Sequence, residues 1–177
     1  MGRFEGIRLY ADEISELLAP GETALFFQLC HPDVGERHLD GVDPPPRGTP
    51  GSVGEGLRRL AGGSPVVNLA EYFWGVSASG TPSSWAGRVS RAFPPVGTHL
   101  LITDRRLAFV HKPVDLHPKL EVLIEVPLDE VWWAERRWKA PMFGCVEIWF
   151  TDDSMVAVGL SFVSPRKAYR VARLLNE

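Results

Sequence analysis

The sequence predicts a mainly β domain with flanking helices, closed by a helix at its C-terminal end. Two observations carry this prediction. From residue 98 onward, apolar and polar residues alternate with a period of two, which is typical of half-buried strands. The chain then ends in a segment whose apolar residues recur with helical spacing, so this segment must pack one face on the sheet.

The composition is that of an ordinary globular protein. The 177 residues fit one domain and can bury a substantial core. Apolar residues make up 45% of the chain and charged residues 23%. The 19 lysines and arginines stand against 22 aspartates and glutamates, for a net charge of −3. Nucleic-acid-binding modules usually carry an excess of basic residues, so we expect no nucleic-acid partner.

The sequence shows no targeting signal. Its N-terminus matches neither a signal peptide nor a myristoylation pattern. The longest uncharged run, over 72–87, is short for a membrane span. We therefore expect a cytoplasmic protein. Cys30 and Cys145 lie in apolar runs and make no disulfide framework, so we expect both to be small buried hydrophobic residues.

The first half of the chain has weak periodicity. Apolar residues at i, i+3 and i+4 predict a short helix over 12–18, and an apolar run predicts a buried strand over 24–30. Between 31 and 63, proline and glycine are frequent and aliphatic residues are few, which predicts mostly loop. We expect short helices over 53–60, 66–74 and 83–93, the last capped by Ser83 or Ser84.

The second half predicts a series of strands, over 98–103, 107–112, 121–126 and 131–138. A hairpin over 145–160 follows, with Asp152 and Asp153 at its turn. Alternation places six of its residues in the core, namely Val146, Ile148, Phe150, Val156, Val158 and Leu160. It points Glu147, Trp149, Met155 and Ala157 the other way.

The final helix has clear start signals. Ser164 can cap it, and Pro165 takes the first helical position, where a missing N–H costs nothing. Its apolar stripe consists of Ala168, Val171, Ala172 and Leu175. Its basic side chains, Arg166, Lys167, Arg170 and Arg173, are expected to form a solvated outer face, or to approach an anionic lipid or acidic partner.

Three segments together resemble a bacterial PH/GRAM-like domain. They are Leu-Ile-Thr-Asp-Arg-Arg-Leu-Ala-Phe-Val at 101–110, Val-Pro-Leu-Asp-Glu-Val at 126–131, and Leu-Ala-Pro-Gly-Glu at 18–22. The resemblance covers 98–177 well and 12–30 loosely. Residues 31–97 depart from it and read as a glycine- and proline-rich, partly helical insertion after the first strand of a single domain spanning 1–177.

The resemblance implies a bent, seven-stranded β-sandwich or partial barrel, with one end plugged by the C-terminal helix. It implies no particular chemistry. Such folds host phosphoinositide sites, peptide grooves and oligomerising scaffolds, and a fold does not dictate a function.

The densest candidate for a site lies in the aromatic and basic stretch 132–143. Its candidate binding residues are Trp132, Trp133, Arg136, Arg137, Trp138 and Lys139. Tryptophan with arginine is typical of binding hot spots. Alternation would place Trp132, Arg136 and Trp138 on one face of the strand, and Trp133, Glu135 and Arg137 on the other. The alternative is a structural role, in which these tryptophans cover the sheet or pack under the insertion.

Catalytic signals are missing from the sequence. The histidines and Cys30 lack the spacing of zinc ligands, and no Gly-x-Ser-x-Gly nucleophile motif occurs. We therefore expect no metal, no cofactor and no enzymatic activity.

The function that we expect is that of a non-catalytic binding or scaffold module. It would act through protein–protein contacts and self-association. The alternative is a peripheral module that binds an anionic membrane surface through the stretch 132–143. A third interpretation is an enzyme or small-ligand carrier with a pocket under the insertion.

Overall fold

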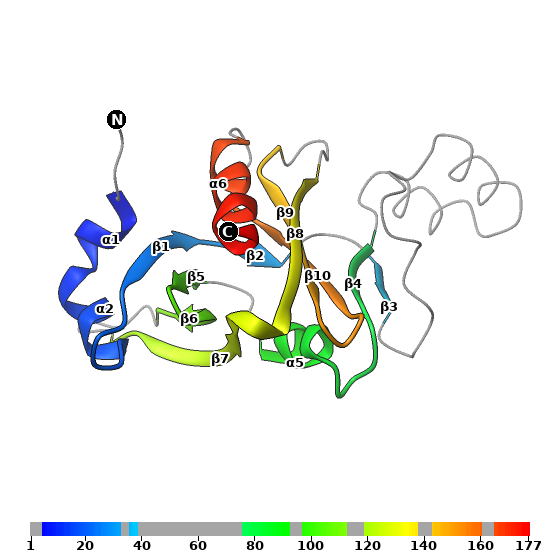
Figure 1. The fold of residues 1–177 in the computed structure, drawn as a ribbon, viewed down its shortest axis with the longest axis horizontal. Coiled ribbons are helices and arrows are strands. Elements are labelled where there is room, and N and C mark those ends of the chain that lie inside the picture. The colour runs from blue at the N-terminus through cyan, green and yellow to red at the C-terminus, as the bar shows by residue number, and fades with distance from the viewer. Residues whose placement is uncertain are drawn as a thin grey trace, which may run out of the picture.

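The computed structural model describes seven segments of the chain, which are 5–32, 36–38, 76–92, 97–112, 119–137, 143–160 and 165–177. Their strands form two sheets, and a helix at the C-terminal end lies across the space between them (Figure 1). The predicted mainly β architecture, with antiparallel sheets and a C-terminal helix, is thereby confirmed. No helix in the described segments is long and apolar enough to cross a membrane.

Sheet A has four antiparallel strands in the order β1-β5-β6-β7. They are β1 (Ala24–Leu29), β5 (Thr98–Thr103), β6 (Arg106–His111) and β7 (Glu121–Pro127). Each lies within one residue of the strand that the sequence predicts. Periodicity locates them well because sheet A buries alternate residues on two different apolar clusters.

Sheet B has the order β3-β4-β10-β9-β8, and β2 also pairs with β10. Its strands are β8 (Val131–Arg137), β9 (Cys145–Phe150), β10 (Met155–Gly159), β4 (Val76–Ser79), β3 (Glu36–His38) and β2 (His31–Pro32). Among the strands of the described segments, only β3 and β4 pair in parallel. The two sheets stay separate and do not close into a barrel.

The insertion contributes strands that the sequence did not predict. Periodicity indicated loop and helices over 31–97, yet β2, β3 and β4 lie there. These strands have two to four residues each, too few to show a period of two. Pairing of β2 and β4 with β10 makes them strands, and this pairing is invisible to local sequence. The predicted helices over 53–60 and 66–74 lie outside the described residues.

The main core lies between the two sheets. Phe26, Leu100 and Phe109 enter it from sheet A, and Ile148 and Val158 enter it from sheet B. Helix α6 (Arg166–Asn176) adds Ala168 and Val171, with Ala172 and Leu175 packed against the same cluster, so the predicted apolar stripe is confirmed. The predicted cap of α6, Ser164, lies outside the described residues.

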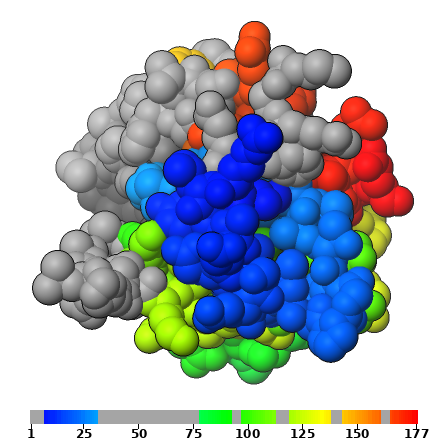
Figure 2. Space-filling model, turned by 90° about the vertical axis from the view of Figure 1, so that its left-hand side faces the viewer, coloured from blue at the N-terminus to red at the C-terminus, as the bar shows by residue number. Residues whose placement is uncertain are grey.

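Two N-terminal helices cover the other face of sheet A (Figure 2). They are α1 (Glu5–Leu9), which the sequence did not indicate, and α2 (Ala11–Leu17), which matches the helix predicted over 12–18. Ile14 of α2 is buried against Phe27 and Leu101. The helix is short because Pro20 and Gly21 follow it, and Gly21 takes a positive φ of 76°.

Helix α5 (Trp85–Ala92) is capped by residues from two parts of the chain. The hydroxyl of Ser84 accepts a hydrogen bond from the N–H of Gly87 at 3.2 Å, which confirms one of the two predicted caps. Asp152 Oδ2 accepts from the N–H of Trp85 at 2.7 Å, and Ser154 Oγ accepts from the N–H of Ala86 at 3.1 Å. The β9–β10 turn thus holds α5 in place.

The β9–β10 hairpin has the predicted register. Val146, Ile148, Phe150, Val156 and Val158 lie in the main core, as alternation indicated. The residues on the opposite face are also buried, where Cys145, Trp149, Met155 and Ala157 form a small separate cluster. The turn is completed by Asp153 at a φ of 62°, a conformation that aspartate tolerates better than most residues.

A buried ion pair joins two of the three segments that carry the PH/GRAM-like resemblance. Glu22, which follows α2, contacts Arg106 at the start of β6 with an Oε1–Nε distance of 2.8 Å. Its carboxylate also accepts from the hydroxyl of Thr103 at 2.7 Å and from the N–H of Ala19 at 2.7 Å. Arg106 in turn donates to the carbonyl of Leu17 at 2.6 Å. These motif residues therefore tie α2 to sheet A.

The environment of Glu22 strongly favours its charged form. Burial by itself would raise the pKa of this carboxyl. Hydrogen bonds from Arg106, the N–H of Ala19 and Thr103, together with the charge of Arg106, outweigh burial and lower the pKa from 4.5 to about 2. A lowered pKa means that the ion pair stabilises the fold above the pKa of the unfolded chain. This stabilisation is lost as the pH falls from about 4.5 towards 2.

Replacing Glu22 with glutamine should lower the free energy of unfolding at pH 7 by roughly 3 kcal/mol, because the substitution leaves the Arg106 charge with less compensation. The variant should also lose part of the wild-type decline in stability between pH 5 and pH 2. Urea unfolding across this pH range measures both effects, with Glu121→Gln on the exposed surface of β7 as the control. Equal pH dependence in wild type and Glu22→Gln would contradict the assignment.

Replacing Ile148 with alanine should cost about 2–5 kcal/mol of stability, because the side chain is fully buried and its loss leaves a cavity in the main core. Chemical denaturation measures the change. Val122→Ala on β7, where the side chain is exposed, serves as the control and should cost far less. An unchanged unfolding midpoint for Ile148→Ala would show that the register of β9 is wrong.

Candidate contact surface on strand β8

A β-bulge decides where the two tryptophans of β8 point. Val131 pairs with Phe150, and the next paired residue is Trp133, opposite Trp149, so Trp132 is an extra residue in the strand. As a result Val131 and Ala134 are buried. Trp132 and Trp133 are 48% and 46% exposed. The strict alternation expected for this strand is therefore wrong at Trp132, and the core takes neither indole.

The backbone of β8 is capped by the last turn of α6. The N–H of Ala134 donates to Asn176 Oδ1 at 2.9 Å, and Asn176 Nδ2 donates to the carbonyl of Ala134 at 2.8 Å. The side-chain amide of Asn176 thus makes the two hydrogen bonds with Ala134 that a residue of a neighbouring strand would make. Because β8 is the edge of sheet B, this cap occupies groups that could otherwise pair with another chain.

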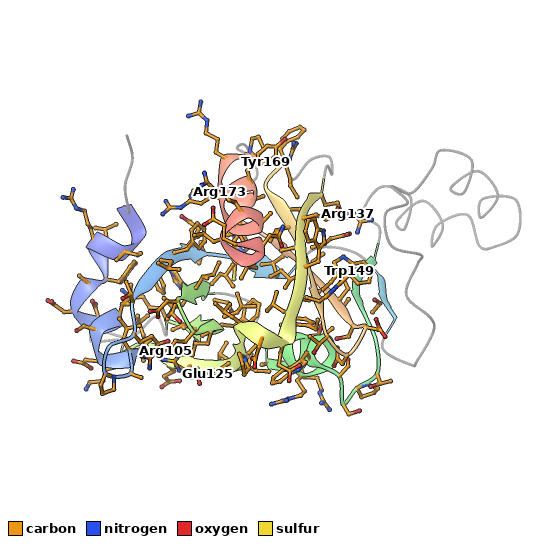
Figure 3. All side chains as sticks on the ribbon, in the orientation of Figure 1. Arg105, Glu125, Arg137, Trp149, Tyr169 and Arg173 are labelled. Carbon is orange, nitrogen blue, oxygen red and sulfur yellow. The ribbon has the colours of Figure 1, made fainter. Side chains whose placement is uncertain are left out.

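Arg136 is held against α6. Its Nη1 donates to the hydroxyl of Tyr169 at 2.8 Å, and its guanidinium carbon lies 4.8 Å from the centroid of the Tyr169 ring. Tyr169 projects from the outer side of α6 and is 57% exposed (Figure 3). The Nε of Arg136 is buried without a hydrogen-bond partner. Arg136 has no carboxylate partner within the described part of the chain, so its charge is oriented but not neutralised.

Arg137 lies on the opposite face of β8 and forms an ion pair with Glu147 of β9. Glu135 shares this face, directly across the sheet from Glu147. The Arg137–Glu147 ion pair lies on a largely buried face of sheet B, because Glu147 is only 9% exposed and Trp149 only 6%. Glu135 is exposed and has no ion pair to any described residue. Unlike Arg137, it can meet a partner from outside.

The six candidate binding residues predicted from the sequence therefore divide into three groups by their position in the structure. Trp132, Trp133 and Arg136 lie at or near the surface of β8, while Arg137 is engaged with Glu147. Trp138 and Lys139 lie outside the described residues. The sequence did not identify Glu135 as a site residue, although its charge beside two arginines was a usable signal. We call Trp132, Trp133, Glu135, Arg136 and Arg137 the β8 surface.

The basic residues of α6 do not all form a solvated face. Arg170 Nη2 donates to the carbonyl of Leu25 in β1 at 3.2 Å, and its guanidinium lies 5.8 Å from the centroid of the Phe26 ring. Arg173 forms an i, i+4 pair with Glu177 and is exposed. Arg170 thereby attaches the middle of the helix to sheet A, while Asn176 attaches its C-terminal end to sheet B.

In the described segments no three His, Cys, Asp or Glu side chains are grouped where they could hold a metal ion. Cys30 and Cys145 are both buried, as predicted, and burial raises the pKa of the Cys30 thiol. His99 stacks on Phe27 at 4.8 Å between ring centroids, and burial lowers its pKa.

Comparison with known proteins finds no protein-family model that matches the chain, and no curated protein matches it either. The fold and the β8 surface thus define the chain only as a mainly β protein with an exposed aromatic pair on an edge strand.

Replacing Asn176 with alanine should reduce stability by about 1–3 kcal/mol, because the N–H and carbonyl of Ala134 lose both of their side-chain partners. Thermal or urea unfolding measures the loss. Arg173→Ala on the same helix removes an exposed ion pair and should change stability by less than about 1 kcal/mol. Similar values for the two variants would contradict the role of Asn176 as a strand cap.

Proposed function

We propose that this chain is a non-catalytic binding module with a PH-like fold, and that it associates with a second copy of itself through the β8 surface. The observation that carries the proposal is the pair of adjacent, half-exposed indoles at Trp132 and Trp133. Tryptophan is the residue most enriched in interface hot spots, and two neighbouring indoles leave a costly apolar area in water.

The charges of the β8 surface favour a second copy as the partner. A two-fold interface places the same patch against itself, so the patch must be self-complementary. Glu135 and Arg136 are neighbours of opposite charge, and neither has an oppositely charged partner among the described residues. The two side chains leave β8 on opposite faces, because consecutive residues of a strand alternate. A two-fold axis parallel to β8 brings opposite faces of the two copies level, so that Glu135 of each copy can approach Arg136 of the other, while indoles accept guanidinium groups on their faces.

The contact would be made by side chains and not by strand addition. Asn176 already binds the N–H and the carbonyl of Ala134, and the bulge at Trp132 disrupts the regular edge. The PH-like assignment of the fold is supported by the Glu22–Arg106 ion pair, which joins two of the three segments that carry the resemblance.

Replacing Trp132 and Trp133 together with serine should weaken self-association at least about 30-fold, because each buried interfacial tryptophan contributes at the level of a hot spot. Sedimentation velocity over a concentration series measures the dissociation constant. Leu9→Ser is the matched control, since Leu9 is 76% exposed on α1 and lies on a different element. Circular dichroism and the unfolding midpoint report whether each variant keeps the fold.

A charge exchange tests the two-fold arrangement directly. Glu135→Arg should weaken the dimer by placing like charges together, and the double variant Glu135→Arg with Arg136→Glu should restore it. A wild-type protein that sediments as a monomer at all concentrations contradicts self-association. If anionic vesicles bind the wild type but not the tryptophan variant, the β8 surface belongs to a lipid contact instead.

A further inference from the structure

A second surface of the molecule is formed by α5 and the open edge of sheet A. A hollow of about 630 Å³, open to solvent, lies between them and is lined by Arg88, Arg91, Ala92, Leu123, Ile124 and Glu125. Helix α5 provides the first three of these residues and β7 the other three. None of them belongs to the β8 surface.

The two arginines of this hollow are held in place by neighbours that do not cancel their charge. The guanidinium of Arg88 lies 4.1 Å from the centroid of the Trp85 ring. Arg91 Nη2 donates to the carbonyl of Pro82. Neither arginine forms an ion pair with a described residue. They lie three residues apart on α5, so their side chains start from the same face of the helix.

The indole of Trp85, on which Arg88 stacks, is itself held by hydrogen bonds. Trp85 Nε1 donates to Glu130 Oε2 at 3.3 Å, and the backbone N–H of Trp85 donates to Asp152. A stacked guanidinium keeps its N–H groups in the plane of the group, where they can bind a carboxylate in bidentate fashion. Little conformational freedom of Arg88 is then lost on binding, which favours affinity.

The acidic residues nearby are already engaged. Glu125, in the wall of the hollow, forms an ion pair with Arg106. Glu130 accepts hydrogen bonds from Trp85 and from the hydroxyl of Thr151. The hollow therefore presents a net positive charge from α5 above a floor that includes half-buried Leu123, Ile124 and Ala92.

We propose that the hollow between α5 and β7 binds an acidic peptide segment of a partner protein, with its carboxylates on Arg88 and Arg91 and its apolar side chains on Leu123. Charge complementarity identifies the partner, because two oriented and uncompensated guanidinium groups favour carboxylates. The hollow is too open to enclose a small molecule, whose sites usually bury most of the ligand.

Charge should contribute more to this recognition than backbone pairing. Leu123 is an extra residue in β7, since Phe109 pairs with Ile124 and Val110 with Val122. Such a bulge interrupts the regular edge that strand addition needs, and Pro127 at the end of β7 lacks a donor. Binding should therefore weaken steeply as the salt concentration rises.

Fluorescence polarisation with a labelled peptide of alternating glutamate and valine tests the proposal on the full chain. The wild type should bind this peptide in low salt and should not bind the matching peptide of lysine and valine. Arg88→Gln with Arg91→Gln should weaken binding about tenfold or more, because two charge-assisted contacts are lost. Arg8→Gln with Arg173→Gln makes the same charge change on α1 and α6 and should leave binding within about twofold.

Two further variants keep the test decisive. Leu123→Glu alters the hollow from the β7 side and should also weaken binding, even if the arginine variant fails to fold. Trp132→Ser with Trp133→Ser should leave peptide binding unchanged, which separates this site from the proposed dimer surface.

Three results would overturn the proposal. The first is equal binding of the glutamate and lysine peptides, and the second is an equal loss in the Arg8 and Arg173 control. The third is co-sedimentation with phosphatidylserine vesicles that depends on Arg88 and Arg91 while the acidic peptide does not bind, since this would assign the hollow to a membrane.

Discussion

The ion pair between Glu22 and Arg106 is the interaction on which the arrangement of sheet A depends. It lies where the chain passes from α2 into β1, and it connects this point to the β5–β6 turn across 84 positions of sequence. Asp104 strengthens the same junction, because its side chain accepts from the N–H of Thr23 at 2.9 Å. Through Glu125, the network extends to β7. One network of charges thus positions the N-terminal helices and most of sheet A.

The second constraint on the structure is the irregular backbone of the edge strands in both sheets. Each of the edge strands β1, β7 and β8 contains an extra residue, at Leu25, Leu123 and Trp132 respectively. Bulges of this kind discourage uncontrolled strand pairing. Helix α6 adds to this protection on both sheets, through Arg170 on the carbonyl of Leu25 and Asn176 on Ala134. The helix therefore joins the sheets and also blocks two of their edges.

Because the backbone groups of these edge strands are blocked in this way, we expect side chains to make the contacts with other molecules. The bulge at Trp132 turns its indole outward beside that of Trp133, and the bulge at Leu123 lies in the wall of the hollow beside α5. The first surface is aromatic and carries both charges, which suits a copy of itself. The second is cationic over an apolar floor, which suits an acidic chain. The two proposed contacts lie on different elements, so both can be occupied at once.

The sequence by itself determined the strands from residue 98 onward, the core face of the β9–β10 hairpin, the Ser84 cap of α5 and the apolar stripe of α6. These features follow from local periodicity and from a few capping residues, such as Ser84. Tertiary structure alone decided the outward position of Trp132, because a bulge depends on how β8 pairs with β9. It also decided that β4 is a strand and that Arg88 faces β7. Each of these depends on a neighbour distant in the chain, and local patterns do not record which distant segments meet.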